Sequence, residues 1–142
     1  MDEEDSNLTR EWMTKALHDL QNARIVSRDK NGPLDTAIYH CQQAAEKSLK
    51  AWLVWTNVEF NKTHDVARLV LQAAETEPGF TELSEAAQLL NPYVSAFRYP
   101  GMTDELMPTR EQFDETLQHA QTIYDFVLNL LPKEAQPIKI QP

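Results

Sequence analysis

The stretch from Tyr39 to Trp52 reads YHCQQAAEKSLKAW and has the periodicity of a helix that is buried on one side. Wound at about 100° per residue, this segment gathers one set of apolar residues on a single side. That set is Leu34, Ile38, Cys41, Ala45, Leu49 and Trp52. The opposite side carries what we call the polar stripe: Tyr39, Gln43, Glu46, Lys47 and Lys50. The stripe has two interpretations, a solvated surface held by a Glu46–Lys50 pair or a face built to bind something.

Helical periodicity continues along the rest of the chain, and strand-like alternation is hard to find. The pattern predicts helices over residues 9–28, 33–56, 64–76, 81–90 and 109–131, with an ordered loop over 92–108. Thr109 and Gln112 form a predicted capping box at the start of the last helix. The expected fold is all-α, an antiparallel up-and-down four-helix bundle with an extra short helix. Its expected parts are a disordered acidic N-terminus (1–8), the helical bundle domain (9–131) and an extended tail (132–142).

Composition restricts the partners that this chain can bind. The sequence has 142 residues, with 13 basic and 22 acidic side chains, and a net charge of −9. Such a surface repels bare polyphosphate at long range, so a nucleic-acid contact needs a local basic patch. The single cysteine, Cys41, can form neither an internal disulfide nor a thiolate zinc site, which favours a reducing cytoplasm. We expect a cytoplasmic protein with no membrane segment, no metal and no cofactor.

Several segments together resemble the HEPN domain family. YHCQQAAEKSLKAWL followed by KTHDVARLV is similar to its central motif, in which a Gln-x-Ala-Glu-Lys helix precedes a His-Asp or His-Asn pair. WMTKALHDLQNARIV, AFRYP and TLQHAQTIYDFV resemble its first helix, its Arg-Tyr-Pro loop and its last helix. The resemblance covers residues 9–131 and implies a bundle of four or five helices that forms a homodimer. Many members are encoded beside, or fused to, a minimal nucleotidyltransferase, often as a toxin–antitoxin pair.

A catalytic branch of this family cleaves RNA with an arginine and a histidine that are separated by about four to six intervening residues. In that branch the histidine serves in acid–base chemistry and the arginine holds phosphate. No arginine of this sequence has a histidine at that distance, and Arg10 misses His18 by one residue. We therefore expect no catalytic residue of that type and no metal-independent ribonuclease activity.

The resemblance and the periodicity together give a candidate site. We expect the polar stripe to join Lys62, His64, Arg98 and Tyr99 in a site for a nucleotide or a partner protein. Lys47, Lys50 and Arg98 against Glu46 would make a positive patch on an acidic protein. Two structural roles stay open, namely His64 as a residue of a capped helix start and Arg98 as a strut.

The expected function is that of a non-catalytic HEPN protein in a toxin–antitoxin-like system. It would bind a nucleotide, a partner minimal nucleotidyltransferase, or both. The alternatives are a divergent ribonuclease that uses His64 and Arg98, with RNA as substrate, and a pure dimerisation module without a ligand.

Overall fold

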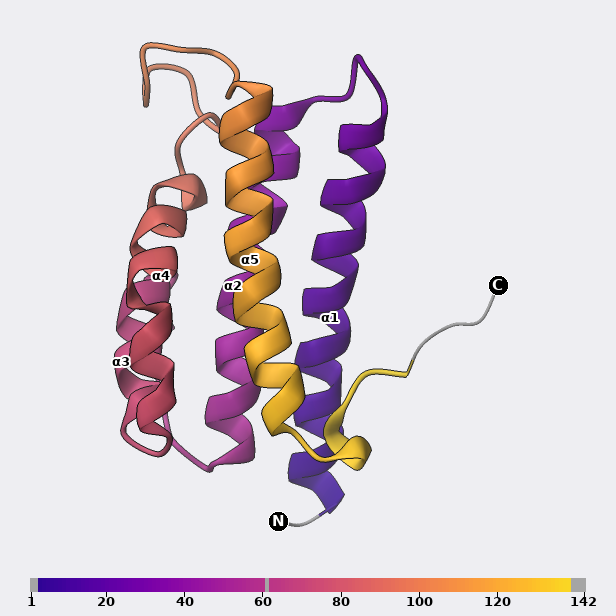
Figure 1. Cartoon of the computed structure of the whole chain (residues 1–142), viewed down its shortest axis with the longest axis vertical. Helices are drawn as coiled ribbons and strands as arrows, with labels where there is room; N and C mark the ends of the chain where they lie inside the picture. The colour runs from indigo at the N-terminus through magenta and orange to yellow at the C-terminus, as the bar shows by residue number, and fades with distance from the viewer. Residues whose placement is uncertain (1–2, 61, 139–142) are drawn as a thin grey trace.

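The central element of the fold is helix α2 (Leu34–Trp55), which is buried along most of its length. The computed structural model describes residues 3–60 and 62–138. Figure 1 shows α5 (Arg110–Leu130) in front of α2, with α1 (Glu3–Arg28) on the right and the shorter pair α3 (Val66–Ala74) and α4 (Ser84–Leu90) on the left. Short 3₁₀ segments lie between α3 and α4 (Pro78–Leu83), after α4 (Asn91–Val94) and after α5 (Lys133–Ala135). The described residues contain helices and no strand, so the predicted helical bundle is confirmed.

Local sequence signals set the helix ends. Thr109 Oγ1 accepts from the Gln112 backbone N–H, and Gln112 Oε1 accepts from the Thr109 N–H, which is the predicted capping box. Asp65 caps α3 by accepting from the Arg68 N–H, so that helix begins at Val66 and leaves His64 outside it. Asn57 has a φ of 57°, and the following Val58 N–H donates to the Leu53 carbonyl at 2.8 Å. This left-handed residue ends α2 in a Schellman motif.

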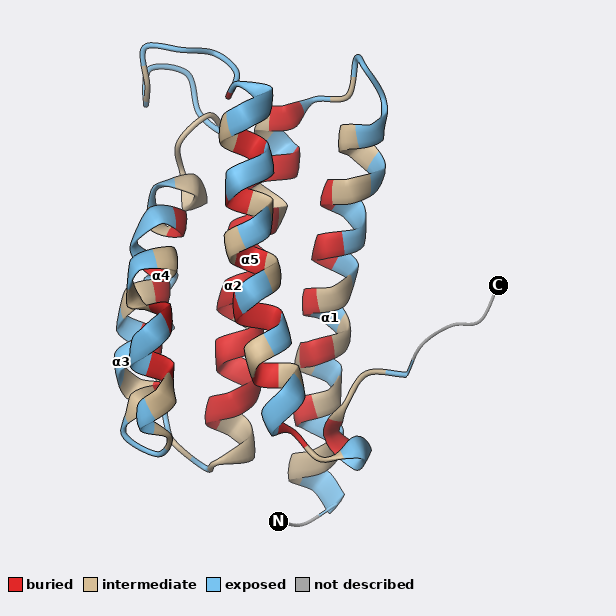
Figure 2. Ribbon diagram, viewed as in Figure 1, coloured by how far each residue is buried: buried red, intermediate tan, exposed pale blue. Residues whose placement is uncertain are grey.

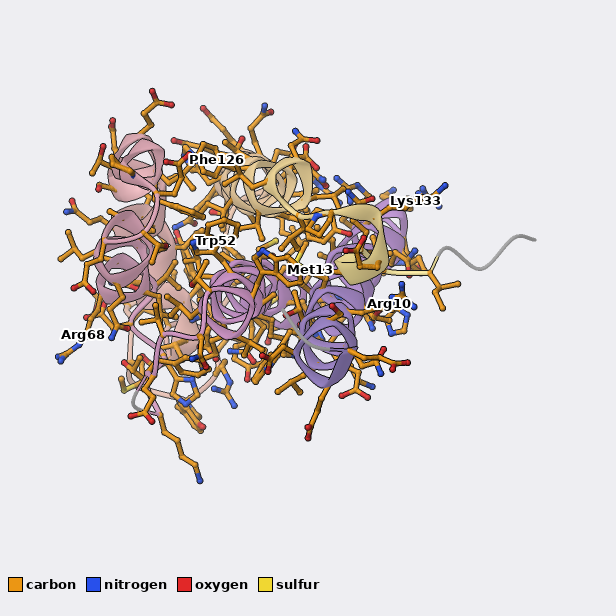
Figure 3. All side chains as sticks on the ribbon, turned by 90° about the horizontal axis from the view of Figure 1, so that it is seen from below. Arg10, Met13, Trp52, Arg68, Phe126 and Lys133 are labelled. Carbon is orange, nitrogen blue, oxygen red and sulfur yellow. The ribbon has the colours of Figure 1, made fainter. Side chains whose placement is uncertain are left out.

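Both ends of the chain are more ordered than the sequence predicted. Residues 3–8 were expected to be disordered but form the first turns of α1, where three acidic side chains favour the helix N-terminus. The tail was expected to be extended, yet residues 133–135 form a 3₁₀ turn with Ala135 fully buried. Arg10 holds this segment by donating to the carbonyls of Glu134 and Gln136 at 2.6 and 3.0 Å (Figure 3). Residues 1–2 and 139–142 lie outside the described residues.

The core lies on both sides of α2, as the buried residues in Figure 2 show. Trp52 packs against Phe80 at 5.5 Å between ring centroids, and Phe80 packs against Phe126 at 4.8 Å. Trp55 and Phe60 pack against this core while partly buried. Full burial of a side chain such as Phe80 contributes about 1.5–3 kcal/mol, and the partly buried aromatic side chains contribute less. Within the described part of the chain, no helix has both the length and the apolar composition to cross a membrane.

The connection from α2 to α3 positions the candidate site. It leaves the C-terminal end of α2 and returns along the same helix. The hydrogen bond from Gln42 Nε2 to the His64 carbonyl, at 3.1 Å, marks this path. Gln42 precedes Trp55 by more than three helical turns, so His64 lies beside the middle of α2. This returning segment, residues 56–60 and 62–65, covers part of the polar stripe, because Phe60 lies over Lys50 and His64 bonds Glu46.

Candidate functional site

The polar stripe is largely buried, which neither interpretation of the sequence anticipated. Gln43, Glu46 and Lys50 are only 9%, 3% and 7% exposed. The Lys50 ammonium lies 5.7 Å from the ring centroids of both Trp12 on α1 and Phe60 in the returning segment. These two aromatic residues cover the lysine. The stripe is therefore an interior surface along this part of α2, not a solvated face.

Glu46 is the acceptor at the centre of this buried polar group, which we call the Glu46 network. Its Oε2 accepts a hydrogen bond from Lys50 Nζ at 3.0 Å, and its Oε1 accepts one from Gln42 Nε2 at 3.2 Å. Gln43 Nε2 lies 3.5 Å from Oε1 and donates a better bond, at 2.8 Å, to Gln42 Oε1. A buried carboxylate is costly unless it is paired and hydrogen-bonded, and here it has both kinds of partner.

His64 completes the Glu46 network from the returning segment. Its Nδ1 lies 2.9 Å from Glu46 Oε1, and its side chain remains 67% exposed. Because a carboxylate oxygen accepts, Nδ1–H donates and Nε2 is left as the second nitrogen of an oriented imidazole. Asp65 caps α3, so both the helix start and the histidine have structural partners.

Lys47 belongs to a separate group, which we call the Asp19 cluster. It donates to Asp19 Oδ2 at 2.7 Å, while His40 Nδ1 bonds Asp19 Oδ1 at 2.8 Å. Asp19 is on α1 and its side chain is 10% exposed, so the cluster joins α1 to α2. Lys47 and Lys50 each pair with a carboxylate within the bundle. The cationic patch expected from the sequence therefore has fewer positive charges open to a ligand.

Arg98 keeps an exposed guanidinium and meets the stripe only at its first residue. Its Cζ lies 4.0 Å from the Tyr39 ring centroid and 5.1 Å from that of Tyr99, and Nη1 donates to the Val94 carbonyl at 2.7 Å. Stacking on tyrosine faces fixes the planar guanidinium and leaves other N–H donors available. We call Tyr39, Arg98 and Tyr99 the Arg98 face.

His64 and Arg98 are anchored at different points along α2. His64 is anchored on Glu46 and Arg98 on Tyr39, which are seven residues apart on α2. This spacing puts the two anchor points about 10 Å apart along the helix axis. Lys62 is exposed and likewise lies in the returning segment. The predicted single site therefore divides into the Glu46 network, the Asp19 cluster and the Arg98 face.

The loop that carries Arg98 has a constrained backbone and a cavity. Phe97 has a φ of 68°, a conformation that costs a residue with a side chain about 1–2 kcal/mol. Its ring stacks on Tyr93 with 6.1 Å between centroids, which holds this conformation next to Arg98. The cavity has a volume of about 280 Å³. Its lining residues are Asp35, Phe97, Arg98, Tyr99, Pro100, Gly101, Thr103, Asp104, Glu105 and Leu106.

Two features argue against metal or thiol chemistry in the described part of the chain. No cluster of three or more His, Cys, Asp or Glu among residues 3–60 and 62–138 could hold a metal ion. Burial raises the pKa of the Cys41 thiol from 9.0 to about 12, which disfavours the nucleophilic thiolate.

Sequence reasoning missed Asp19, His40 and Gln42 as members of these clusters. Asp19 had a signal, because it falls on the same side of its helix as the buried Ala16, Leu20 and Ala23. A carboxylate on an apolar face predicts a buried partner. Gln42 had a weaker signal, since it adjoins the apolar side of α2 and ends fully buried.

Comparison with known proteins gives a consistent result. The family model for the HEPN domain matches residues 9–131. The crystal structure of TT1696 from Thermus thermophilus is 29% identical, with a TM-score of 0.74, and the match covers 87% of this chain and 98% of that one. The structure of ST0689, described as an archaeal HEPN homologue, is 25% identical, with a TM-score of 0.68 and coverage of 84% and 93%. None of the curated proteins compared with the chain matches it.

Proposed function

The chain belongs to the HEPN domain family, and from this premise we propose that it acts by binding a protein partner and not by cutting RNA. The partner that the family resemblance implies is a minimal nucleotidyltransferase in a toxin–antitoxin-like pair, with the HEPN chain as a homodimer. We propose the cytoplasm as its compartment, since its one cysteine cannot form an internal disulfide.

The observation that carries this proposal is the exposed guanidinium of Arg98 held on two tyrosine rings. Arginine and tyrosine are the residue types that supply much of the binding energy at protein interfaces. The guanidinium is already fixed by Tyr39 and the Val94 carbonyl, so a partner would lose little entropy in ordering it. The Arg98 face is therefore well suited to anchor a partner.

The charges around the stripe favour a protein over a nucleotide. Lys47 and Lys50 would have to leave Asp19 and Glu46 before they could bind phosphate. The cavity next to Arg98 contains three carboxylates, which repel phosphate. A nucleotide remains the second candidate on one observation, namely that the exposed Arg98 could hold a phosphate in a bidentate bond.

We propose that His64 and Arg98 of one protomer do not act together on RNA, because they have separate anchor points on α2. His64 is oriented by Glu46, but acid–base catalysis on RNA also needs a phosphate-binding group within reach of the imidazole. Arg98 is anchored about two helical turns away from that position.

Co-purification tests the proposal, with the partner taken as the minimal nucleotidyltransferase that the family resemblance expects beside such a chain, here called the adjoining gene product. The two chains should elute together, with a mass by light scattering equal to that of a stable complex of both. Calorimetric titration with ATP and AMP forms the second arm. Separate elution would overturn the partner proposal, and a nucleotide affinity that is lost in Arg98→Ala would promote the second candidate.

A further inference from the structure

We infer that the partner is held through a basic, apolar segment that docks on the loop surface, which we define as residues 97–107 together with Asp35. This inference rests on the proposed function and names the partner's chemistry at the Arg98 face. It concerns a surface to which the family resemblance assigns no such role beyond the Arg-Tyr-Pro motif.

The loop surface carries an unusual density of exposed apolar side chains. Among the described residues, ten large hydrophobic side chains are exposed, and four of them fall within residues 99–107. Those four are Tyr99 at 53%, Met102 at 55%, Leu106 at 82% and Met107 at 40% exposed. Single exposed apolar residues are ordinary, but a cluster in one segment marks an interaction surface. Methionine and tyrosine are also enriched at protein interfaces.

Three carboxylates line the same cavity as Tyr99 and Leu106, two of these four apolar residues. Asp35 comes from the first turn of α2, while Asp104 and Glu105 come from the loop itself. Arg98 also lines the cavity, and its guanidinium, which lies against Tyr39, offsets one of the three negative charges. At about 280 Å³ the cavity falls below the roughly 300–1,000 Å³ of typical small-molecule pockets. It is suited to one long side chain, and its charge selects lysine or arginine.

Long-range charge acts in the same direction. Residues 75–115 contain nine acidic and two basic side chains, so the segment that includes the loop is strongly acidic. A field of this sign attracts a basic segment and accelerates its association, and it opposes an anionic ligand. The apolar residues then supply the contact area, as when an amphipathic segment binds a groove. Apolar contact and charge together define a partner segment with alternating apolar and basic residues.

The probe is a synthetic amphipathic peptide of leucine and lysine, titrated into the full-length protein by calorimetry. A peptide with glutamate in place of every lysine is the charge control. We expect the lysine peptide to bind and the glutamate peptide not to bind. Failure of the lysine peptide to bind, or equal binding of both peptides, would overturn the inference.

Matched variants locate the binding. Asp104→Asn with Glu105→Gln should weaken binding of the lysine peptide about tenfold or more. Asp114→Asn with Glu115→Gln on the exposed face of α5 changes the net charge equally and should alter binding less than about twofold. Equal losses in the two double variants would mean general attraction to an acidic protein and would overturn the docking surface.

A second pair of double variants tests the apolar contact of the loop surface. Met102→Ser with Leu106→Ser should weaken binding of the lysine peptide about tenfold, because the contact area is lost. Leu71→Ser with Leu89→Ser removes exposed apolar side chains from α3 and α4 and should leave the affinity unchanged. No difference between these variants would contradict the inference. These outcomes do not depend on complex formation with the adjoining gene product, so failure of the proposed function is seen separately.

Discussion

Lys50 follows Glu46 by one helical turn, and its ammonium lies 3.0 Å from the Glu46 carboxylate although both side chains are almost fully buried. A pair of this spacing on a surface contributes only a few tenths of a kcal/mol. Inside a bundle the same pair matters more, since removal of either partner leaves an uncompensated buried charge at a cost of about 3–5 kcal/mol. The Glu46–Lys50 pair therefore belongs to the fold of this protein.

Glu46→Gln should destabilise the protein by about 3 kcal/mol, because it leaves the buried Lys50 ammonium without an anion. Equilibrium unfolding in guanidinium chloride measures this change. His64→Ala should cost only about 1 kcal/mol, since its imidazole is mostly exposed and Glu46 keeps its other donors. Glu59→Gln is the exposed control and should be neutral. Equal stability of the Glu46 and Glu59 variants would show that the network is dispensable.

Alkaline pH should weaken the fold through Cys41. Its pKa rises from 9.0 to about 12 on burial, so the unfolded thiol loses its proton above pH 9 while the folded thiol keeps it. The contribution of the Cys41 thiol to the free energy of unfolding is complete below pH 9 and is lost as pH rises toward 12. The free energy falls by up to about 1.4 kcal/mol per pH unit in that range. Unfolding experiments on the wild type and on Cys41→Ala isolate this slope. A slope that persists in Cys41→Ala would assign it to other groups, such as Tyr124, whose pKa is also raised to about 12.

The protein should be a homodimer, with a mass of about twice 16.3 kDa by gel filtration with light scattering. This prediction now rests on family membership, because Trp52 is in the core and Trp55, Phe60 and Phe97 pack against it. A monomer at micromolar concentration would count directly against it.

Purified protein should leave single-stranded RNA and tRNA intact, with or without divalent metal. The reason is that no arginine has a histidine at the spacing of the family's catalytic motif. Cleavage that is lost in His64→Ala would reverse this conclusion, and cleavage that survives that change would indicate a contaminating nuclease.

The helices were predictable because their signals are local. The apolar period of α2, the Thr109 capping box and the proline-bounded loop each depend on residues close in sequence. The order of the C-terminal tail has a tertiary cause. Arg10 fixes the backbone near Gln136 across 126 positions of sequence, which no local pattern could indicate.

The candidate site was predictable as a set of residues but not as an arrangement. Periodicity correctly placed Glu46, Lys47 and Lys50 on one side of α2. Whether that side is solvated depends on the path of the returning segment, which brings Phe60 and His64 over it. Lys47 and Lys50 pair with different carboxylates, because Asp19 on α1 binds Lys47. Burial by distant segments is a tertiary property, and it changed the stripe from a proposed binding face into an interior network.

The most direct test of the account is the affinity of the adjoining gene product for wild type, Arg98→Ala and Arg68→Ala, measured by calorimetry with circular dichroism as the folding control. Arg68 is exposed on α3 and points away from the bundle in Figure 3, so it is the matched arginine. We predict that Arg98→Ala keeps its fold and loses about 1–3 kcal/mol of binding free energy, while Arg68→Ala is unchanged. Loss of the fold in Arg98→Ala, or equal affinity of all three proteins, would contradict the claim that the Arg98 face binds the partner.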